Sequence, residues 1–134
     1  MNQFHKKLFI LQQEIGAISR DSKNPYFKSK YFDINSLLKS LLPLLKKHRI
    51  LLLQPIINNE VCTILEDLES DEKRIMSSIP LGDITDPQKL GGAITYYRRY
   101  TLQSLLGLQA EDDDGNTASG KKVENQPKFN QSFI

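Results

Sequence analysis

The spacing of apolar residues changes near Ile50 and again near Asp86, and these changes restrict the fold. Before Ile50, apolar residues recur three and four positions apart, the period of amphipathic helices. Short β-prone runs follow, and the helical spacing returns after Asp86. The predicted order is α-α-β-β-β-α, which indicates one α+β domain over residues 1–116. Residues 117–134 are polar and aperiodic, so we expect a disordered C-terminal tail.

The first third of the chain predicts two helices. Residues 3–19 form the first, and its buried stripe comprises Phe4, Leu8, Leu11, Ile15 and Ile18. Asp33 or Asn35 can cap the second, whose leucines lead to a basic end at residues 46–49 that suits the helix dipole. Pro43 removes one backbone hydrogen bond from this helix, so we expect a kink there or a later start.

Three short runs between residues 50 and 80 predict an antiparallel meander. They are ILLLQPII, VCTILEDL and KRIMSSIP, separated by Asn58-Asn59 and by Ser70-Asp71-Glu72. Pro55 cannot donate to a sheet ladder, so it belongs on an edge strand or at a bulge. We expect this three-stranded sheet to pack on the long third helix.

The third helix has clear start and stop signals. Asp86 can cap it with Pro87 at its first position, and Gly107 is a natural C-terminal stop. At about 100° per residue, the side expected to face the sheet comprises Leu90, Ala93, Ile94, Tyr97, Tyr100, Thr101, Ser104 and Leu105. The opposite side comprises Gly92, Tyr96, Arg99 and Gln103. Arg98 lies at the border between the two sides, beside Leu102.

This opposite side is a candidate binding surface. A glycine inside a helix costs about 1 kcal/mol relative to alanine, so Gly91-Gly92 favours close approach of a partner over helix stability. Arg99 can donate to phosphate oxygens, and Tyr96 can stack on an unpaired base, which together suit single-stranded nucleic acid. The alternative is that Arg99 pairs with an acidic residue and Tyr96 only covers apolar surface.

Positive charge is concentrated at the start of the chain. Residues 1–49 hold ten Lys or Arg against three Asp or Glu, although the net charge of the chain is only +2. A polyanion partner and a solvated lysine-rich face both explain this distribution. The segment 23–32 mixes cations with aromatic rings, of which Phe27 and Phe32 are assigned to packing. Its predicted nucleic-acid contacts are Tyr26, Lys28, Lys30 and Tyr31.

Several classes of function lack support in the sequence. Cys62 is the only cysteine, which excludes a disulfide within the chain and a cysteine-based zinc cluster. There is no GxxxxGK[ST] phosphate loop and no nucleophile paired with a base, and nothing calls for a cofactor. No apolar run approaches a membrane span, and the N-terminus lacks signal-peptide features, so we expect a cytoplasmic protein without a membrane partner.

Two alternative functions stay open. Asp112-Asp113-Asp114 suggests a metal site, although its spacing differs from that of an EF-hand. Together with Asp83 and Asp86, this acidic run would suit a metal-dependent nuclease. A small adaptor that binds protein through the basic face is the other alternative.

Two segments resemble the Erf (essential recombination function) family of phage single-strand annealing proteins. They are GGAITYYRRYTLQSLLGLQAEDDDGN, residues 91–116, and YFKSKYFDINSLLKSLLPLLKKHRILL, residues 26–52. The similarity extends over about residues 24–116. It implies a fold similar to that of the eukaryotic strand-annealing mediators, assembly into rings or arcs, and ATP-independent pairing of complementary strands. It also implies that Arg98 and Arg99 lie near a DNA groove.

The resemblance and the residues together predict a protein without covalent chemistry. It would bind single-stranded DNA and anneal complementary strands in phage homologous recombination and DNA repair. It would act as a homo-oligomer, either a ring, an arc or a filament, in the cytoplasm of the bacterial host. A host single-strand-binding protein is a candidate partner. The predicted DNA-binding residues are Tyr26, Lys28, Lys30, Tyr31, Tyr96, Arg98 and Arg99.

Overall fold

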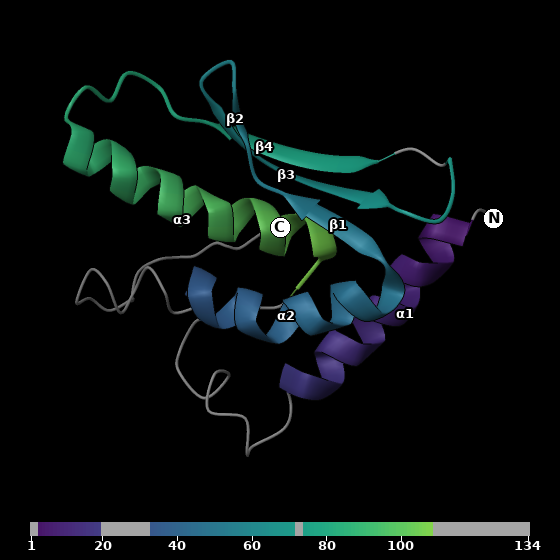
Figure 1. Cartoon of the computed structure of the whole chain (residues 1–134). Coiled ribbons are helices and arrows are strands. Elements are labelled where there is room, and N and C mark those ends of the chain that lie inside the picture. Colours follow the sequence, from purple (N-terminus) through teal and green to yellow (C-terminus); the bar gives the residue numbers. More distant parts are fainter. Residues whose placement is uncertain (1–2, 20–32, 72–73, 109–134) are drawn as a thin grey trace, which may run out of the picture.

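The structure is a computed structural model that describes residues 3–19, 33–71 and 74–108. Its elements are α1 (Gln3–Ser19), α2 (Ile34–His48), β1 (Ile50–Leu53), β2 (Ile56–Ile57), β3 (Glu60–Asp67), β4 (Ile75–Pro80) and α3 (Pro87–Leu106). In Figure 1 the sheet lies above α3, and α2 and α1 lie below it. The predicted α+β class and order of elements are confirmed, except that the first predicted strand is divided into β1 and β2.

The sheet is antiparallel, with β3 at its centre. β1 and β2 pair one after the other with the same edge of β3, and β4 pairs with the other edge. Leu53 pairs with Ile64 and Ile56 with Val61, so β1 and β2 keep a single register across the interruption at Gln54–Pro55. The predicted meander is confirmed, and Pro55 lies on an edge of the sheet, as expected for a residue without a backbone donor.

One face of the sheet packs on α3. The Thr63 and Thr101 hydroxyls are 2.6 Å apart, and the Ser77 hydroxyl donates to the Thr101 carbonyl. Because side chains alternate along a strand, the neighbouring residues face away from α3. Among these, Leu53 and Met76 are exposed, and both pair with Ile64. No helix in the described part of the chain covers this second face (Figure 1).

Helices α2 and α3 have the caps that their sequences predict. Asp33 accepts a hydrogen bond from the Ser36 amide at 2.7 Å, and Asp86 accepts one from the Lys89 amide at 2.8 Å. Gly107 ends α3 with a φ of 66°, a conformation that favours glycine. α2 begins at Ile34 with Pro43 in its interior, so the alternative of a later start is wrong.

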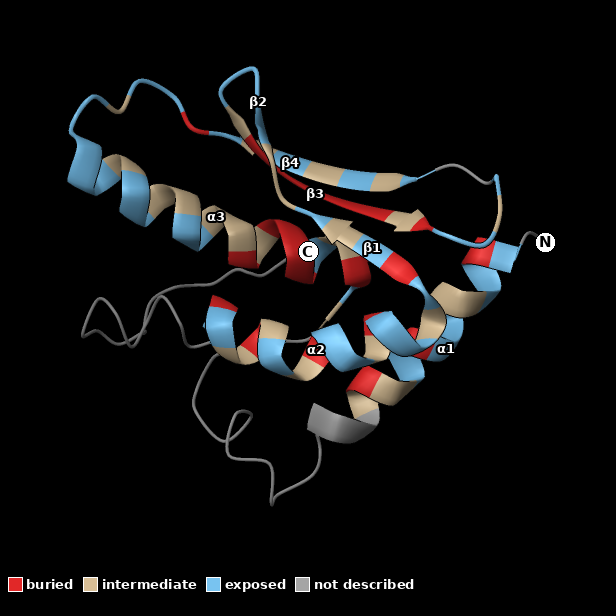
Figure 2. Cartoon of the chain, viewed as in Figure 1, coloured by how far each residue is buried: buried red, intermediate tan, exposed pale blue. Residues whose placement is uncertain are grey.

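The main core lies where the helices meet the sheet. It comprises Phe4, Leu11, Ile15, Ile34, Leu37, Leu41, Leu45, Ile50, Leu65, Leu102 and Leu106. Figure 2 shows that burial in α3 is confined to its C-terminal half, whereas its N-terminal half is exposed or half-buried. None of the described helices is long and apolar enough to span a membrane.

Ion pairs hold α1 in place. The Lys7 ammonium lies 2.6 Å from Asp67 and 2.7 Å from Glu69, and the Asp67 side chain is fully inaccessible to solvent. Burial opposes ionisation of Asp67, but hydrogen bonds from Lys7, the Glu69 amide and Ser70 outweigh it and lower the pKa of this carboxyl. At the other end of α1, hydrogen bonds from Lys47 and His48 lower the pKa of Glu14.

Candidate nucleic-acid interface

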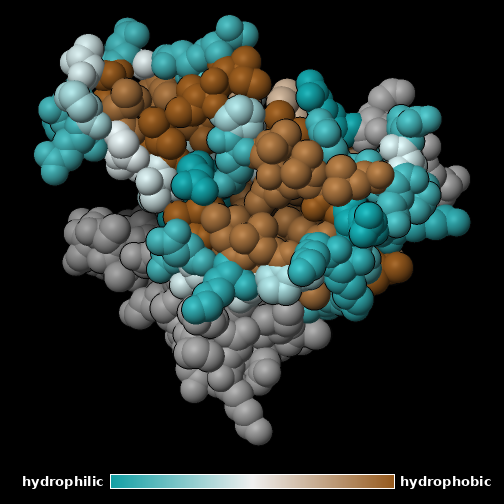
Figure 3. All heavy atoms as spheres, in the orientation of Figure 1, coloured by the Kyte–Doolittle hydropathy of each residue, from teal (hydrophilic) through white to brown (hydrophobic). Residues whose placement is uncertain are grey.

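A groove opens where α2, β1 and α3 meet. Its volume is about 430 Å³, and its lining residues are Leu38, Leu42, Leu52, Gln54 and Arg98. Figure 3 shows the apolar side chains gathered on this face of the molecule, where α2 approaches β1. Three leucines therefore line the groove, together with Gln54 and the cation of Arg98.

Gln54 holds Arg98 at the wall of the groove. The Arg98 Nε atom donates to Gln54 Oε1 at 2.9 Å. In return, Gln54 Nε2 donates to the Arg98 carbonyl at 3.0 Å and lies 2.9 Å from the Thr63 hydroxyl. Among the described residues, we find no hydrogen bond from the two terminal nitrogens of Arg98. They form the part of the guanidinium that can bind an anion in two places.

Exposed cations run along α2 beside the groove. At 100° per residue, Lys39 and Lys46 share one side of this helix with the groove residue Leu42. Both lysines are exposed, and so is Arg49, the C-cap of α2, which lies 3.3 Å from Glu69. Sequence reasoning counted these charges but did not assign them to a site. Their spacing on the predicted helix was the signal that could have done so.

The predicted faces of α3 are wrong in its C-terminal half. Arg99 and Gln103, expected on an open face, are each only 5% exposed, whereas Ser104, expected against the sheet, is exposed. The cause is that a second layer, formed by the other helices, covers this half of α3 on the side away from the sheet. Leu102 and Leu106 belong to the main core, and Gln12 of α1 donates to the Leu106 carbonyl at 2.7 Å. This half of α3 therefore lies between the sheet and the other helices.

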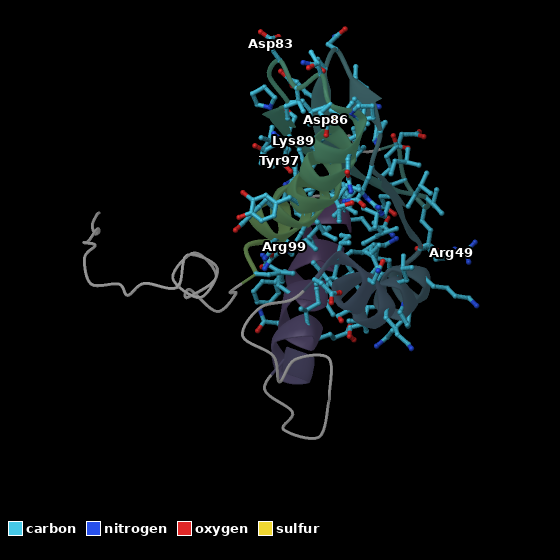
Figure 4. All side chains as sticks on the ribbon, turned by 90° about the vertical axis from the view of Figure 1, so that its left-hand side faces the viewer. Arg49, Asp83, Asp86, Lys89, Tyr97 and Arg99 are labelled. Carbon is cyan, nitrogen blue, oxygen red and sulfur yellow. The ribbon has the colours of Figure 1, made fainter. Side chains whose placement is uncertain are left out.

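Arg99 lies among aromatic rings. Its guanidinium carbon is 4.5 Å from the Tyr100 ring centroid and 5.3 Å from that of Tyr96, and one nitrogen donates to Gln103 at 3.4 Å. The two tyrosine hydroxyls are 3.1 Å apart. Tyr96 is 49% exposed, as its predicted place on an open face requires. Figure 4 shows Arg99 and Arg49 on opposite sides of the molecule.

The glycine pair lies on open surface. Gly91 and Gly92 are exposed, and a Cβ atom added to either would meet nothing within 4 Å. Gly91 precedes Arg98 by seven residues, so the two lie on the same side of α3, about two turns apart. The open surface at Gly91 therefore lies on the side of α3 that carries Arg98.

Several predicted sites lie outside the described residues. They are Tyr26, Lys28, Lys30 and Tyr31, the acidic run Asp112–Asp114, and the tail 117–134. In the segments that the structure describes, no group of three or more His, Cys, Asp or Glu could hold a metal ion. Asp86, which the nuclease alternative used, is the N-cap of α3.

Comparison with known proteins identifies the family. The profile of the ERF superfamily matches residues 4–132, nearly the whole sequence. Searches among curated proteins and among solved structures found no match. At the level of the family, the match supports a function in phage recombination of the strand-annealing type. The chain belongs to the ERF superfamily.

Proposed function

We propose that this protein binds single-stranded DNA and anneals complementary strands without ATP during phage homologous recombination. The observation that carries the proposal is the position of Arg98. Its terminal nitrogens are available at the wall of the groove, and α2 presents Lys39 and Lys46 beside it. Phosphate groups suit such a row of cations, since Arg binds phosphate in two places and each contact releases counterions. The annealing domain would comprise residues 1–116, and residues 117–134 would form a separate tail.

The strand would follow α3 from Arg98 toward Gly91. At Arg98 a phosphate binds, and at Gly91 the absent side chain lets the sugar-phosphate backbone approach the helix. The leucines of the groove offer apolar contact to sugars and bases without reading base identity. Annealing then needs no covalent chemistry. Neutralising phosphates lowers the repulsion between two strands, and an extended backbone presents its bases for pairing.

The other predicted residues have secondary roles in this proposal. Tyr96 offers an exposed ring on which a base can stack. Arg99 is buried against Tyr96 and Tyr100, so it contributes mainly by holding that ring in place. Further contacts to the strand would come from Tyr26, Lys28, Lys30 and Tyr31.

The affinity for DNA should depend steeply on salt and weakly on sequence. Fluorescence anisotropy of labelled 30-nucleotide strands, titrated at about 50 to 300 mM salt, should give a linear fall of log affinity with log salt. Two strands of unrelated sequence should give similar curves. A flat salt response contradicts the proposal. Cleavage of the strand with magnesium would support the nuclease alternative, and absence of any binding would support the adaptor.

We also propose that the protein assembles into a ring, arc or filament. The support is the open face of the sheet, where Leu53 and Met76 are exposed beside Ile64. A repeated heterologous contact closes into a ring or continues as a filament. The assembly would act in the cytoplasm of the bacterial host, where a host single-strand-binding protein is a candidate partner.

Sedimentation velocity tests this assembly. At micromolar concentration the protein should sediment well above its 15.4 kDa monomer mass. Met76→Asp, which introduces a charge on the open face, should shift the distribution toward monomer without loss of the fold, as judged by circular dichroism. A wild-type protein that stays monomeric with DNA present rules the assembly out, and an unchanged Met76→Asp oligomer assigns it to another surface.

A further inference from the structure

We infer that Gln54 is a positioning residue for DNA binding, because it fixes the orientation in which Arg98 faces the groove. The inference rests on the proposed contact between Arg98 and phosphate. Gln54 is not charged and lies 44 residues from Arg98 in sequence, yet the two side chains and one carbonyl form a closed pair of hydrogen bonds. This pair links the edge of the sheet to α3.

The orientation of the guanidinium follows from which nitrogen Gln54 engages. Its Oε1 atom accepts from Nε of Arg98, the nitrogen nearest the helix. An arginine held at Nε keeps both terminal nitrogens for a ligand, and its planar group can rotate little. Ordering a long side chain on binding has a cost that lowers affinity about 2- to 10-fold. Gln54 removes much of that cost from the binding step, since Arg98 is already ordered in the protein without DNA.

Gln54 is itself held by a buried polar network. Its Nε2 atom lies 2.9 Å from the Thr63 hydroxyl, and that hydroxyl is 2.6 Å from the Thr101 hydroxyl. Thr101 in turn donates to the Tyr97 carbonyl at 2.7 Å. Thr63 and Thr101 are both fully or almost fully buried, so the network is shielded from water. Hydrogen bonds in such surroundings are stronger and define one geometry.

The local sequence explains why Gln54 points toward α3. Pro55 restricts the preceding residue to extended conformations. Gln54 also lies opposite Thr63 in the register that β1 and β2 share, so both side chains lie on the face that packs on α3. The interruption between β1 and β2 thus presents a side chain to Arg98 without displacing the rest of the strand.

Glutamine also has the right chemistry for this place. It supplies one acceptor for Arg98 and donors for Thr63 and for the Arg98 carbonyl. Glutamate would keep the acceptor, but it would lose the donors and neutralise the cation. Methionine has a similar length and supplies neither group, so Gln54→Met removes the positioning while conserving most of the volume.

A double-mutant cycle tests the inference. Gln54→Met should weaken binding of a 30-nucleotide single strand about 2- to 10-fold, the factor expected when an ordered arginine becomes free. In a protein that already carries Arg98→Ala, the same change should have no further effect on affinity. Anisotropy gives the affinities, and urea unfolding of each variant gives the stability.

Gln12→Met is the matched control. Gln12 also donates from Nε2 to a carbonyl of α3, that of Leu106, but it is not among the residues that line the groove. Gln12→Met therefore also removes a side-chain hydrogen bond to α3, and it should leave affinity unchanged. A general loosening of α3 would instead weaken binding in both variants.

The outcomes separate the inference from the proposed function. If Arg98→Ala weakens binding and Gln54→Met does not, the positioning role is wrong and the DNA contact stands. If the two effects add in the double variant, Gln54 acts independently of Arg98 and the inference is also wrong. If wild type binds DNA but Arg98→Ala binds equally well, the proposed contact between Arg98 and phosphate is wrong, and the positioning role is wrong with it.

Discussion

Arg98→Ala is expected to weaken binding of single-stranded DNA about 10- to 100-fold, the loss of one charge-assisted contact of about 1.5–3 kcal/mol. The plot of log affinity against log salt should become less steep, with a slope smaller in magnitude by about one, since one phosphate contact is lost. Arg98→Lys should recover only part of the affinity, because an ammonium keeps the charge but not the planar pair of donors. Anisotropy titrations at several salt concentrations measure both quantities.

Lys89→Ala is the matched control for charge. Lys89 is an exposed cation of the same helix, nine residues before Arg98 and therefore on the opposite side. Its removal changes the net charge equally, so any shared loss of affinity reports long-range attraction only. Equal losses in the two variants would contradict the proposed contact. Arg99→Ala should differ from both, since it removes a buried side chain packed on two tyrosines and should mainly reduce stability.

Lys7→Met is expected to lower the free energy of unfolding by about 3 kcal/mol, because it leaves a buried carboxylate without its cation. The Asp67 side chain has no solvent access, and only the Glu69 amide and the Ser70 hydroxyl would remain as donors. Arg74→Met is the contrast. Its pair with Glu66, at 3.5 Å, is exposed and should contribute about 1 kcal/mol or less. Urea unfolding at pH 7 measures both, and equal losses would contradict the argument.

The same ion pair gives a pH dependence with a defined sign. The folded pKa of Asp67 lies below its ordinary value of 3.8, so the pair contributes fully above that value. The contribution is lost as pH falls through the folded pKa. Wild type should therefore lose stability below about pH 4, and its advantage over Lys7→Met should shrink there.

The alkaline side depends on Lys7. Burial disfavours the Lys7 cation, but the hydrogen bonds and charges of Asp67 and Glu69 outweigh the effect of burial and raise the pKa of Lys7 above 10.5. The contribution is therefore lost only above that pH.

Much of the fold could be predicted because its signals are local. Apolar spacing gave α1 its bounds, and Asp33, Asp86 and Gly107 act as caps through contacts three or four residues away. Pro55 signalled the edge strand because proline lacks a backbone donor. Each of these inferences needs only the chain within one or two turns.

The candidate site depends on distant parts of the chain and was predicted only in part. Helical spacing separated Arg98 from Arg99, but it could not show that a second layer covers α3 beyond residue 98. Nothing in the sequence marked Gln54, whose partners Thr63 and Arg98 come from β3 and α3. The groove itself exists only because three elements meet, so no single segment carries its pattern.

The uneven burial of α3 has a consequence for local opening. Its C-terminal half lies between two layers, whereas the described part of the chain covers residues 87–97 on the sheet side only. Amide protons in the first half should therefore exchange with solvent at a lower opening free energy than those in the second. Arg98 lies at the boundary, where the rigid segment begins. Under the proposed function, the N-terminal half of α3 would open locally to fit either a single strand or a newly paired duplex, while Arg98 would keep its place on the backbone.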